Sequence, residues 1–451
     1  MSEPSPPQRH SLPRATFLAL QADVVTAVSA LVVAIIVARG LGTAGRGVYF
    51  LAILAATMIA LVGNMGLATT AIVYGAKQRF PLGELHGLAI TFSLIVGVLG
   101  AALLLGFEDF WVSTVLGGVD HQTMLLVAIS IAPLVYGQIA GAMLTGMGHV
   151  PEISLMRIVL AIVTPIITIP AVLVSDQDPF WPVAAWLATT VGFAAALGWY
   201  AGRAIARPTR PSRAVIREAT SFSLRGHVGT LAHQGFLRVD VLFVSAKLGD
   251  SAVGLYAQAS VLAERMSTLG HAVYSSSAAR LGSDPPAAAA QLAAELVRVL
   301  LLVMVPVAIV LAVLSKPIMV VLFGSDFGPA AEPFAILLPG AVCLTLWYVV
   351  ALYIMSSLHR PGTTTLIQGL AFVISAPLYW IAVQEWGLNG AATVSTLTYA
   401  TVFAAGLIIL ERSPHVSWRD LVPTMHDVRH MAELGRRGLA ALPVRRPARS
   451  R

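Results

Sequence analysis

The chain has 451 residues, of which 57% are hydrophobic and only 11% are charged, with a formal net charge of +7 and a mean hydropathy of +0.79. A soluble domain carries about 25% charged residues, so this composition excludes a water-soluble globular protein. The one cysteine, Cys343, lies in an apolar stretch, which excludes a disulfide framework and a cysteine-rich zinc site.

Twelve apolar stretches are long enough to cross a bilayer as helices, which predicts an all-α polytopic membrane protein. In chain order they are approximately 15–38, 48–73, 86–106, 122–146, 153–175, 181–202, 220–245, 252–278, 294–323, 331–356, 363–384 and 388–410. They form two predicted six-helix bundles, 15–202 and 220–410, joined by an Arg-rich cytoplasmic linker, 203–219. A cytoplasmic N-terminal tail, 1–14, and a basic cytoplasmic tail, 411–451, flank the bundles.

The positions of lysine and arginine predict the orientation. With a cytoplasmic N-terminus, 20 Lys and Arg residues flank the spans on the cytoplasmic side, and four lie opposite: Arg39, Arg46, Lys247 and Lys316. Cytoplasmic loops are enriched in these residues, so we expect a multi-pass protein of the plasma (inner) membrane with both termini cytoplasmic. Because the arginines are spread over several membrane-flanking segments, no nucleic-acid partner is expected. Two interpretations of the basic tail stay open, an amphipathic helix on the inner leaflet and a disordered segment.

A stretch of nine residues is repeated in similar form later in the chain. "LGTAGRGVY" at 41–49 and "LGDSAVGLY" at 248–256 each follow a span that runs from the inside to the outside. An even number of spans separates the two copies, so the halves have the same orientation and form a parallel repeat. We interpret the nine residues as structural, with a glycine that permits a turn at positive φ and a tyrosine at the membrane interface.

These stretches resemble the outer loops of the polysaccharide-exporter branch of the multidrug/oligosaccharidyl-lipid/polysaccharide (MOP) superfamily, the Wzx-type flippases. "GNMGLATTAIVYGAK" at 63–77 and "VLFGSDFGPAAEPFAILLPGAV" at 321–342 resemble the same branch. The resemblance extends over about 15–410 and implies a MATE-like fold, with two six-helix bundles around a central cavity. It also implies a polyprenyl-pyrophosphate-linked oligosaccharide or related glycolipid as substrate, and polysaccharide polymerases and glycosyltransferases as partners in the same biosynthesis, besides membrane lipids.

Ionisable residues inside the spans are costly in lipid, so they normally face protein or water. The seventh predicted span carries most of them. His227, Gln234 and Arg238 share one face of this helix. His233 and Asp240 share another face. Because both polar faces cannot point into lipid, we expect this helix to line a hydrated cavity.

Two sets of candidate residues follow from this cavity. Phosphate suits the forked guanidinium of arginine, which donates two parallel hydrogen bonds, and sugar hydroxyls suit other polar side chains. The substrate-binding candidates are Arg225, Arg238, Arg265, Gln234, His227 and Arg157. The candidates for a proton or cation relay are Asp23, Glu264, Asp240 and His233. The alternative is that these arginines and acids pair inside the bundles and only hold helices together.

The sequence contains no GxxxxGK[ST], HExxH or GxSxG motif, so we expect a non-enzymatic protein without a cofactor or metal. The predicted function is a flippase that moves a lipid-linked oligosaccharide to the outer leaflet by alternating access, for cell-surface polysaccharide biosynthesis. Two alternatives stay open. One is a cation-coupled multidrug exporter of the same superfamily, and the other is a membrane polysaccharide polymerase or polyprenyl-dependent glycosyltransferase.

Overall fold

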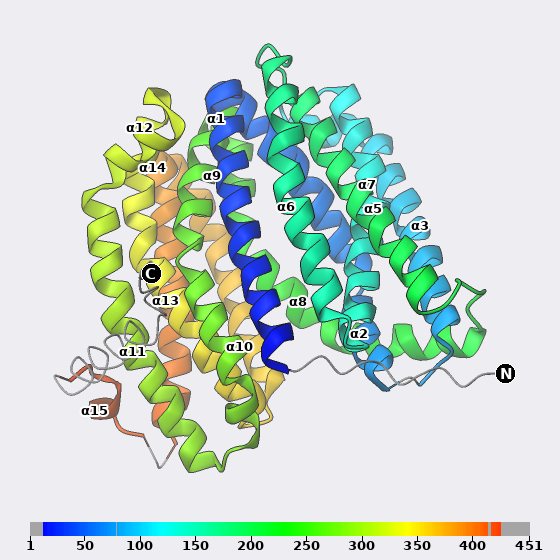
Figure 1. The fold of residues 1–451 in the computed structure, drawn as a ribbon. Coiled ribbons are helices and arrows are strands. Elements are labelled where there is room, and N and C mark those ends of the chain that lie inside the picture. Colours follow the sequence, from blue (N-terminus) through cyan, green and yellow to red (C-terminus); the bar gives the residue numbers. More distant parts are fainter. Residues whose placement is uncertain (1–11, 78, 414–415, 425–451) are drawn as a thin grey trace, which may run out of the picture. The chain divides into compact units, whose positions relative to one another are not determined.

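The computed structural model describes residues 12–77, 79–413 and 416–424, and within these ranges the chain forms helices and short connections without a strand (Figure 1). The all-α fold is therefore confirmed. The N-terminal residues 1–11 and the tail from 425 onwards lie outside the described residues, and so does nearly all of the segment for which a surface helix was considered.

Within the described residues, the first part of the chain forms seven helices and follows the predicted spans closely. They are α1 Leu12–Asn64, α2 Leu67–Lys77, α3 Leu82–Gly106, α4 Glu108–Thr114, α5 His121–Gly146, α6 Val150–Leu173 and α7 Phe180–Ala204. Backbone hydrogen bonding continues through α1, but Gly42 interrupts it with a non-helical conformation. The first two predicted spans are thus one kinked helix whose second limb is continued, after a break, by α2.

The second part of the chain contains the remaining helices of the described residues. They are α8 Arg213–Leu248, α9 Asp250–Glu264, α10 Ser267–Ser283, α11 Pro286–Val313, α12 Ser315–Phe323, the 3-10 helix η1 Ser325–Ala330, α13 Ala331–Ser356, α14 Pro361–Glu411 and α15 Trp418–Leu421. A non-helical Gly387 kinks α14 in the same way that Gly42 kinks α1.

Among the described residues, eight helical stretches are long and apolar enough to cross a membrane. Two of these, in α1 and α14, are 48 and 51 residues long and are kinked, so each is long enough for two crossings. The remaining two predicted crossings correspond to α8 and to α9 with α10. Their polar residues keep their hydropathy below that of the other spans, and the total of twelve stays a prediction.

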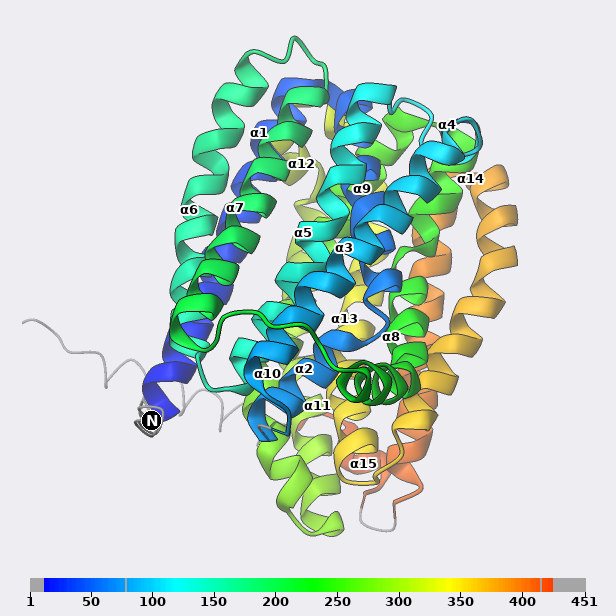
Figure 2. The same cartoon turned by 90° about the vertical axis from the view of Figure 1, so that its right-hand side faces the viewer.

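The helices gather into two compact units. The first comprises the described residues up to Ala259 together with Lys316–Ala331 and Ala376–Ala391, and the second comprises Ser260–Ser315, Glu332–Ser375 and the described residues from Ala392 onwards. In the first unit, α5 contacts α1, α2, α3 and α7, and α8 contacts α2 and α3. Figures 1 and 2 show α3, α5 and α7 side by side. The predicted division into bundles at the linker 203–219 stays a prediction.

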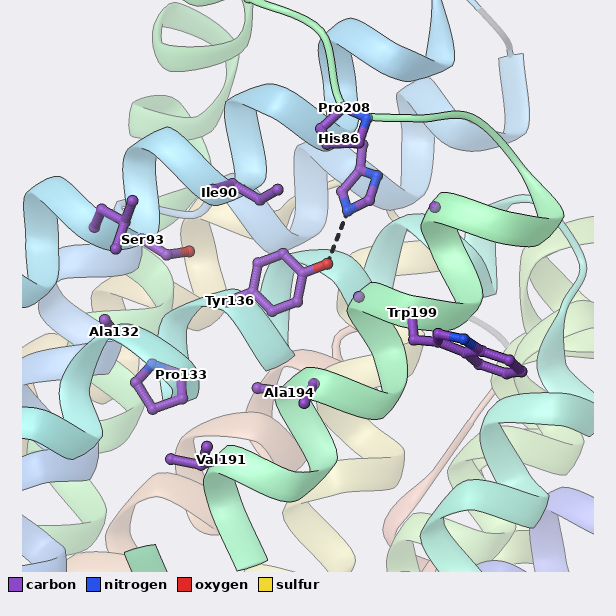
Figure 3. A pocket seen from close by; sticks show the side chains of 14 residues that line it. His86, Ile90, Ser93, Ala132, Pro133, Tyr136, Val191, Ala194, Trp199 and Pro208 are labelled. Atoms are coloured by element: carbon purple, nitrogen blue, oxygen red, sulfur yellow. Dashed lines mark hydrogen bonds between the residues drawn. The ribbon is translucent and has the colours of Figure 1, made fainter. Parts of the chain in front are cut away.

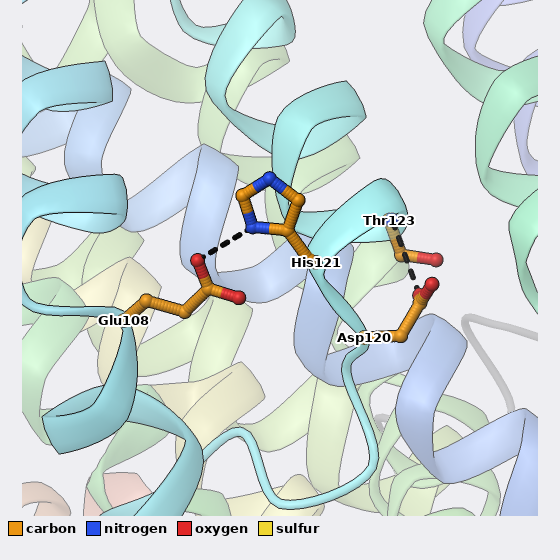
Figure 4. A network of polar contacts seen from close by, with 4 residues as sticks. All are labelled: Glu108, Asp120, His121 and Thr123. Atoms are coloured by element: carbon orange, nitrogen blue, oxygen red, sulfur yellow. Dashed lines mark hydrogen bonds and ion pairs between the residues drawn. The ribbon is translucent and has the colours of Figure 1, made fainter.

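The connection between α4 and α5 shows how local chemistry sets a helix start. Asp120 caps α5, since its carboxylate accepts a hydrogen bond of 3.1 Å from the backbone N–H of Thr123. Such a cap typically contributes about 1 kcal/mol. The next residue, His121, places its Nδ1 2.7 Å from Oε2 of Glu108 at the start of α4 (Figure 4). The cap thus starts α5, and the contact between His121 and Glu108 holds the short α4 against its beginning.

The first glycine of each copy of the repeat adopts a similar backbone conformation. Gly42 has φ 66° and ψ −169°, and Gly249 has φ 77° and ψ −177°. A residue with a Cβ atom would be strained there, so the predicted glycine turn is confirmed. The turn joins helix directly to helix, and no loop follows it. Arg46 therefore lies in the second limb of α1, and the prediction that it lies in an outer loop is wrong.

The two copies also contact each other through their backbones. A Cβ atom on Gly47 would lie 1.9 Å from the carbonyl oxygen of Asp250, and one on Gly254 would lie 1.9 Å from that of Thr43. In the repeat, Gly47 corresponds to Gly254 and Thr43 corresponds to Asp250. The contact is therefore reciprocal. It explains why both copies carry a second glycine five residues after the first, since any side chain there would separate the two helices.

The tyrosines that end the two copies are buried. Tyr49 is 7% exposed and Tyr256 is 0% exposed, so the prediction that they are interfacial aromatic residues is wrong. Both lie on helix starts that pack inside the first unit. The Tyr256 hydroxyl donates a hydrogen bond of 2.8 Å to Oδ2 of Asp240, and the Tyr49 ring lies 5.5 Å from the guanidinium of Arg46. Tyr256 thus joins the second copy to Asp240 of α8, whereas Tyr49 lies near Arg46 of its own copy.

Replacing either contact glycine by alanine should destabilise the protein. The Cβ atom of Gly47→Ala or Gly254→Ala collides with a backbone carbonyl that cannot move like a flexible side chain. Overpacking of this kind costs about 1–3 kcal/mol. We expect both variants to unfold at a lower temperature in detergent than the wild type. Gly192→Ala is the matched control, because a Cβ atom in that part of α7 meets no atom within 4 Å. Equal stability of all three variants would contradict the close contact.

Candidate functional site

His227 on α8 lies in a helix packing contact. It is buried, and its Nε2 lies 3.1 Å from the carbonyl oxygen of Val62 near the end of α1. One turn earlier on α8, the hydroxyl of Ser223 lies 2.5 Å from that of Thr70 on α2. Nδ1 of His227 is buried and has no hydrogen-bond partner among the described residues. In this conformation His227 fixes α8 to the first helices rather than facing open water.

The other predicted residues of α8 differ in their exposure. His233, Gln234 and Arg238 are partly exposed, whereas Asp240 is only 3% exposed. Asp240 accepts the hydrogen bond from Tyr256 and a second one of 2.8 Å from the backbone N–H of Val241. The two polar faces predicted for this helix are thus unequal, because Asp240 joins α8 to α9. The side chain of Arg225 lies outside the described part of the structure.

Asp23 and Arg157 form an ion pair between α1 and α6. The Nη2 atom of Arg157 donates a hydrogen bond of 2.7 Å to Oδ1 of Asp23. The two side chains are 62% and 36% exposed in the order Asp23, Arg157. Exposed pairs contribute about 0–1 kcal/mol, so this contact orients the helices without holding them strongly together. Asp23, predicted to relay ions, and Arg157, predicted to bind phosphate, are thus paired with each other in this structure.

Glu264 and Arg265 lie at the break between α9 and α10 in the second unit. The carbonyl oxygens of both residues accept hydrogen bonds of 2.6 Å from the hydroxyls of Ser267 and Thr268, respectively. These bonds replace part of the helical ladder where the chain turns. The Arg265 side chain is exposed. A similar interruption, at Met65–Gly66, separates α1 from α2, so both second spans of the repeat are broken.

Arg46 is the functional candidate that the sequence analysis missed. It is 5% exposed, and its guanidinium lies 5.5 Å and 5.6 Å from the ring centres of Tyr49 and Phe50. Its Nη2 atom lies 3.4 Å from Oε1 of Gln258 on α9, a long hydrogen bond. Gln258 in turn donates to the carbonyl oxygen of Ala34. Arg46 therefore lies among both limbs of α1 and α9, one residue from the contact glycine Gly47.

The charge of Arg46 is incompletely satisfied. Its Nε atom is buried without a hydrogen-bond partner, and no carboxylate of the described residues lies within ion-pair distance of its guanidinium. A buried cation without a counter-ion is costly, and such groups are typical of functional sites in membrane proteins. The repeat itself carries the signal for this residue. The corresponding position in the second copy is the apolar Val253, which suggests a buried position, whereas Arg46 beside a turn suggests a solvated loop; the structure buries both side chains.

Asp250 lies at the contact between the two copies, just before the eighth predicted span. Burial raises the pKa of its carboxyl above the ordinary value, and a hydrogen bond from the backbone N–H of Gly118 offsets part of this effect. Its side chain packs closely on that glycine, so a Cβ atom on Gly118 would lie 2.5 Å from Oδ2. Burial at this contact therefore favours the neutral form of the carboxyl, and the hydrogen bond from Gly118 favours the charged form less strongly.

Comparisons with known proteins agree with the predicted fold. A family model described as "Polysaccharide biosynthesis protein" matches residues 36–332. No curated protein sequence matches the chain. The lipid II flippase MurJ in an inward closed conformation has a TM-score of 0.70 at 15% identity, with 94% of this chain and 93% of that chain covered.

Two further solved structures belong to the MOP superfamily by their own descriptions. An inward-facing multidrug resistance MATE family transporter has a TM-score of 0.67 at 16% identity, with 88% of this chain and 99% of that chain covered. A transporter from Pyrococcus furiosus has a TM-score of 0.61 at 12% identity, with 88% and 94% covered. Together these likenesses confirm the predicted MOP-type transporter fold, and the neighbours are transporters and flippases.

Neutralising Arg46 should leave the protein as stable as the wild type or make it more stable. Arg46→Gln removes an uncompensated buried charge and keeps an amide that can hydrogen-bond to Gln258. Arg39→Gln is the matched control on the same helix, because Arg39 is exposed and donates to the carbonyl oxygens of Val321 and Leu322. We expect this control to be the less stable variant in thermal unfolding. A larger loss for Arg46→Gln would show that Arg46 has a structural role.

Proposed function

The chain belongs to the family of polysaccharide biosynthesis proteins, and from this premise we propose that it is a flippase for a polyprenyl-pyrophosphate-linked oligosaccharide or a related glycolipid. It moves this lipid from the cytoplasmic to the outer leaflet of the plasma membrane, with both of its own termini in the cytoplasm. The shared fold with a lipid II flippase supports the proposal, because that neighbour is named for a flipped lipid. The apolar spans support a multi-pass membrane protein.

Arg46 is the observation that most favours an anionic substrate. Its buried guanidinium has one long hydrogen bond to an amide and one unsatisfied N–H. A phosphate oxygen would complete this site, since phosphate accepts strong charge-assisted hydrogen bonds from arginine. A cationic drug would instead be repelled by the same charge. The residue therefore favours a phosphate-bearing lipid over the substrate of a cation-coupled drug exporter.

The position of Arg46 also supports alternating access. It is adjacent to Gly47, which forms the reciprocal contact with the second copy of the repeat on the predicted outer side. While that contact is closed, Arg46 is buried. We infer that the pyrophosphate is first received by Arg238 and Gln234 on α8, with Arg225, Arg265, His227 and Arg157 as further candidates. Opening of the contact then exposes Arg46 to the pyrophosphate. Hydrogen bonds and ion pairs exchange, and no covalent bond is made or broken.

Asp240 is the strongest of the four candidates for ion coupling. Its carboxyl is buried and is held by Tyr256, a residue of the repeat. A buried carboxyl that gains a proton changes the strength of its hydrogen bonds, so protonation can bias the packing of α8 on α9. Asp23 is less suited, because it is largely exposed and already pairs with Arg157. His233 and Glu264 stay candidates of lower rank.

The leaflet that holds the glycolipid tests the proposed function. In a strain that lacks the native gene and expresses Arg46→Gln, complete oligosaccharide-lipid should accumulate on the cytoplasmic face. A membrane-impermeant lectin or glycosidase added to spheroplasts distinguishes the two faces. Arg39→Gln should restore normal export, when the two variants are compared at equal amounts of protein in the membrane.

Other outcomes of this experiment would overturn the proposal. Unpolymerised glycolipid on the outer face of the deletion strain would show that flipping is intact and would favour the polymerase. Unchanged glycolipids in the deletion strain would favour the drug exporter. Normal export by Arg46→Gln would remove Arg46 from the substrate site while leaving the flippase proposal to stand on the deletion strain.

The coupling role of Asp240 predicts a change in the pH dependence of transport. Asp240→Asn keeps a side chain that can accept the hydrogen bond from Tyr256 but cannot take up a proton. We expect its transport in proteoliposomes to vary little with pH, whereas Asp23→Asn should keep the wild-type pH profile. An unchanged profile in Asp240→Asn would assign Asp240 a purely structural role.

A further inference from the structure

A groove in the first unit is lined by none of the residues that the proposed transport uses. It opens between α3, α5 and α7 and has a volume of about 490 Å³ (Figure 3). Its walls are almost wholly apolar, and several of the side chains that line it are exposed at the surface of the unit: Leu94, Val191 and Trp199. Ala132 and Pro133 of α5 line it from the other side. A groove of this kind in a membrane-spanning unit faces hydrocarbon and suits a single lipid chain.

One end of the groove is polar and is built by defined contacts. The His86 Nε2 lies 2.9 Å from the hydroxyl of Tyr136, as Figure 3 shows, and its Nδ1 lies 3.2 Å from the carbonyl oxygen of Ala206. Both side chains line the groove, and so does Pro208 of the Arg-rich linker. The apolar groove therefore ends where the linker begins.

The linker is fixed to α3 at this end. The backbone N–H of Thr209 donates a hydrogen bond of 2.9 Å to the carbonyl oxygen of Gly83, and that of Ser212 donates one of 2.8 Å to Oε2 of Glu84. A Cβ atom on Gly87 would lie 1.8 Å from the carbonyl oxygen of Thr209, so α3 admits the linker backbone only because a glycine lies there. The position of the linker at the end of the groove is thus set by the fold.

The linker places exposed cations around this end. Arg203, Arg207 and Arg210 are all exposed, and none of them forms an ion pair within the described part of the chain. The guanidinium of Arg203 lies 5.3 Å from the ring centre of Trp199, which lines the groove. An apolar channel with a cationic end complements a lipid that has an apolar chain and an anionic head group.

We propose that this groove binds one anionic phospholipid, with a hydrocarbon chain between α3, α5 and α7 and its phosphate at Arg203 and Arg207. The chain displaces solvent and loosely packed lipid from the walls. The phosphate neutralises arginines that have no carboxylate partner. Because the same linker joins the two predicted bundles, a bound phospholipid holds the linker against α3. The position of the linker therefore depends on how much anionic lipid is present in the leaflet that the arginines face.

Native mass spectrometry of the full chain in mild detergent tests this site. Dioleoylphosphatidylglycerol and dioleoylphosphatidylethanolamine are added in turn at equal concentration, and we expect one phosphatidylglycerol to be retained several-fold more strongly. Ala195→Trp fills the groove from an exposed position on α7, and it should lose this retained lipid. Ala188→Trp is the matched control, since Ala188 is exposed about two turns earlier on the same helix and does not line the groove.

The head-group contact is tested by a charge variant. Arg203→Gln with Arg207→Gln should retain the two phospholipids equally, whereas Arg360→Gln with Arg412→Gln, two other exposed arginines, should keep the preference. Thermal unfolding of each variant verifies that it is folded. Equal lipid retention by Ala195→Trp and Ala188→Trp would place the lipid elsewhere and overturn the proposal, as would a wild type without preference. Displacement of phosphatidylglycerol by an equal concentration of polyprenyl phosphate would assign the groove to the cargo chain instead.

Discussion

The reciprocal backbone contact between the two copies of the repeat is the constraint on which the first unit depends. Gly47 lies against the carbonyl of Asp250, and Gly254 lies against the carbonyl of Thr43, with no side chain between the helices. A contact between backbones cannot yield gradually as flexible side chains do, so it is either closed or open. The turns at Gly42 and Gly249 direct the two following helix starts toward each other, and Gly47 and Gly254 let their backbones touch. Each copy therefore needs two glycines at the same spacing.

Around this shared scaffold the two copies have diverged in chemistry. The first has Arg46 where the second has Val253, and both side chains are buried. The second copy ties its tyrosine to Asp240, whereas the tyrosine of the first lies near the guanidinium of Arg46. A buried charge without a counter-ion costs free energy while the contact is closed. The position of Arg46 beside the contact supports the proposed site, which an anionic ligand would complete when the helices separate.

In the proposal above, the Arg-rich linker has a second role besides the predicted ones of joining two bundles and orienting the chain in the membrane. Its backbone is bonded to α3 at Gly83 and Glu84, and its proline lines an apolar groove. The arginines of the linker, which the sequence analysis interpreted as a signal for orientation, thus lie at a defined place in the fold. The same arginines can serve both purposes. An orientation signal depends only on which side of the membrane they lie, whereas a lipid site depends on where their guanidinium groups lie relative to the groove.

Composition, span length and the repeat were sufficient to predict the all-α membrane fold and the glycine turns, because these depend on local hydropathy and local backbone conformation. The MOP-type architecture was implied by the resemblance of four short stretches to a known family. The pairing of Asp23 with Arg157, the burial of Asp240 and the packing of His227 depend on which helices adjoin, and helical periodicity places a residue on a face without naming the neighbour of that face. Arg46 shows the difference most clearly. The sequence places it beside a turn, which suggests a solvated loop, and only the close approach of the second copy of the repeat buries it, because two helices that start with glycine can pack backbone against backbone.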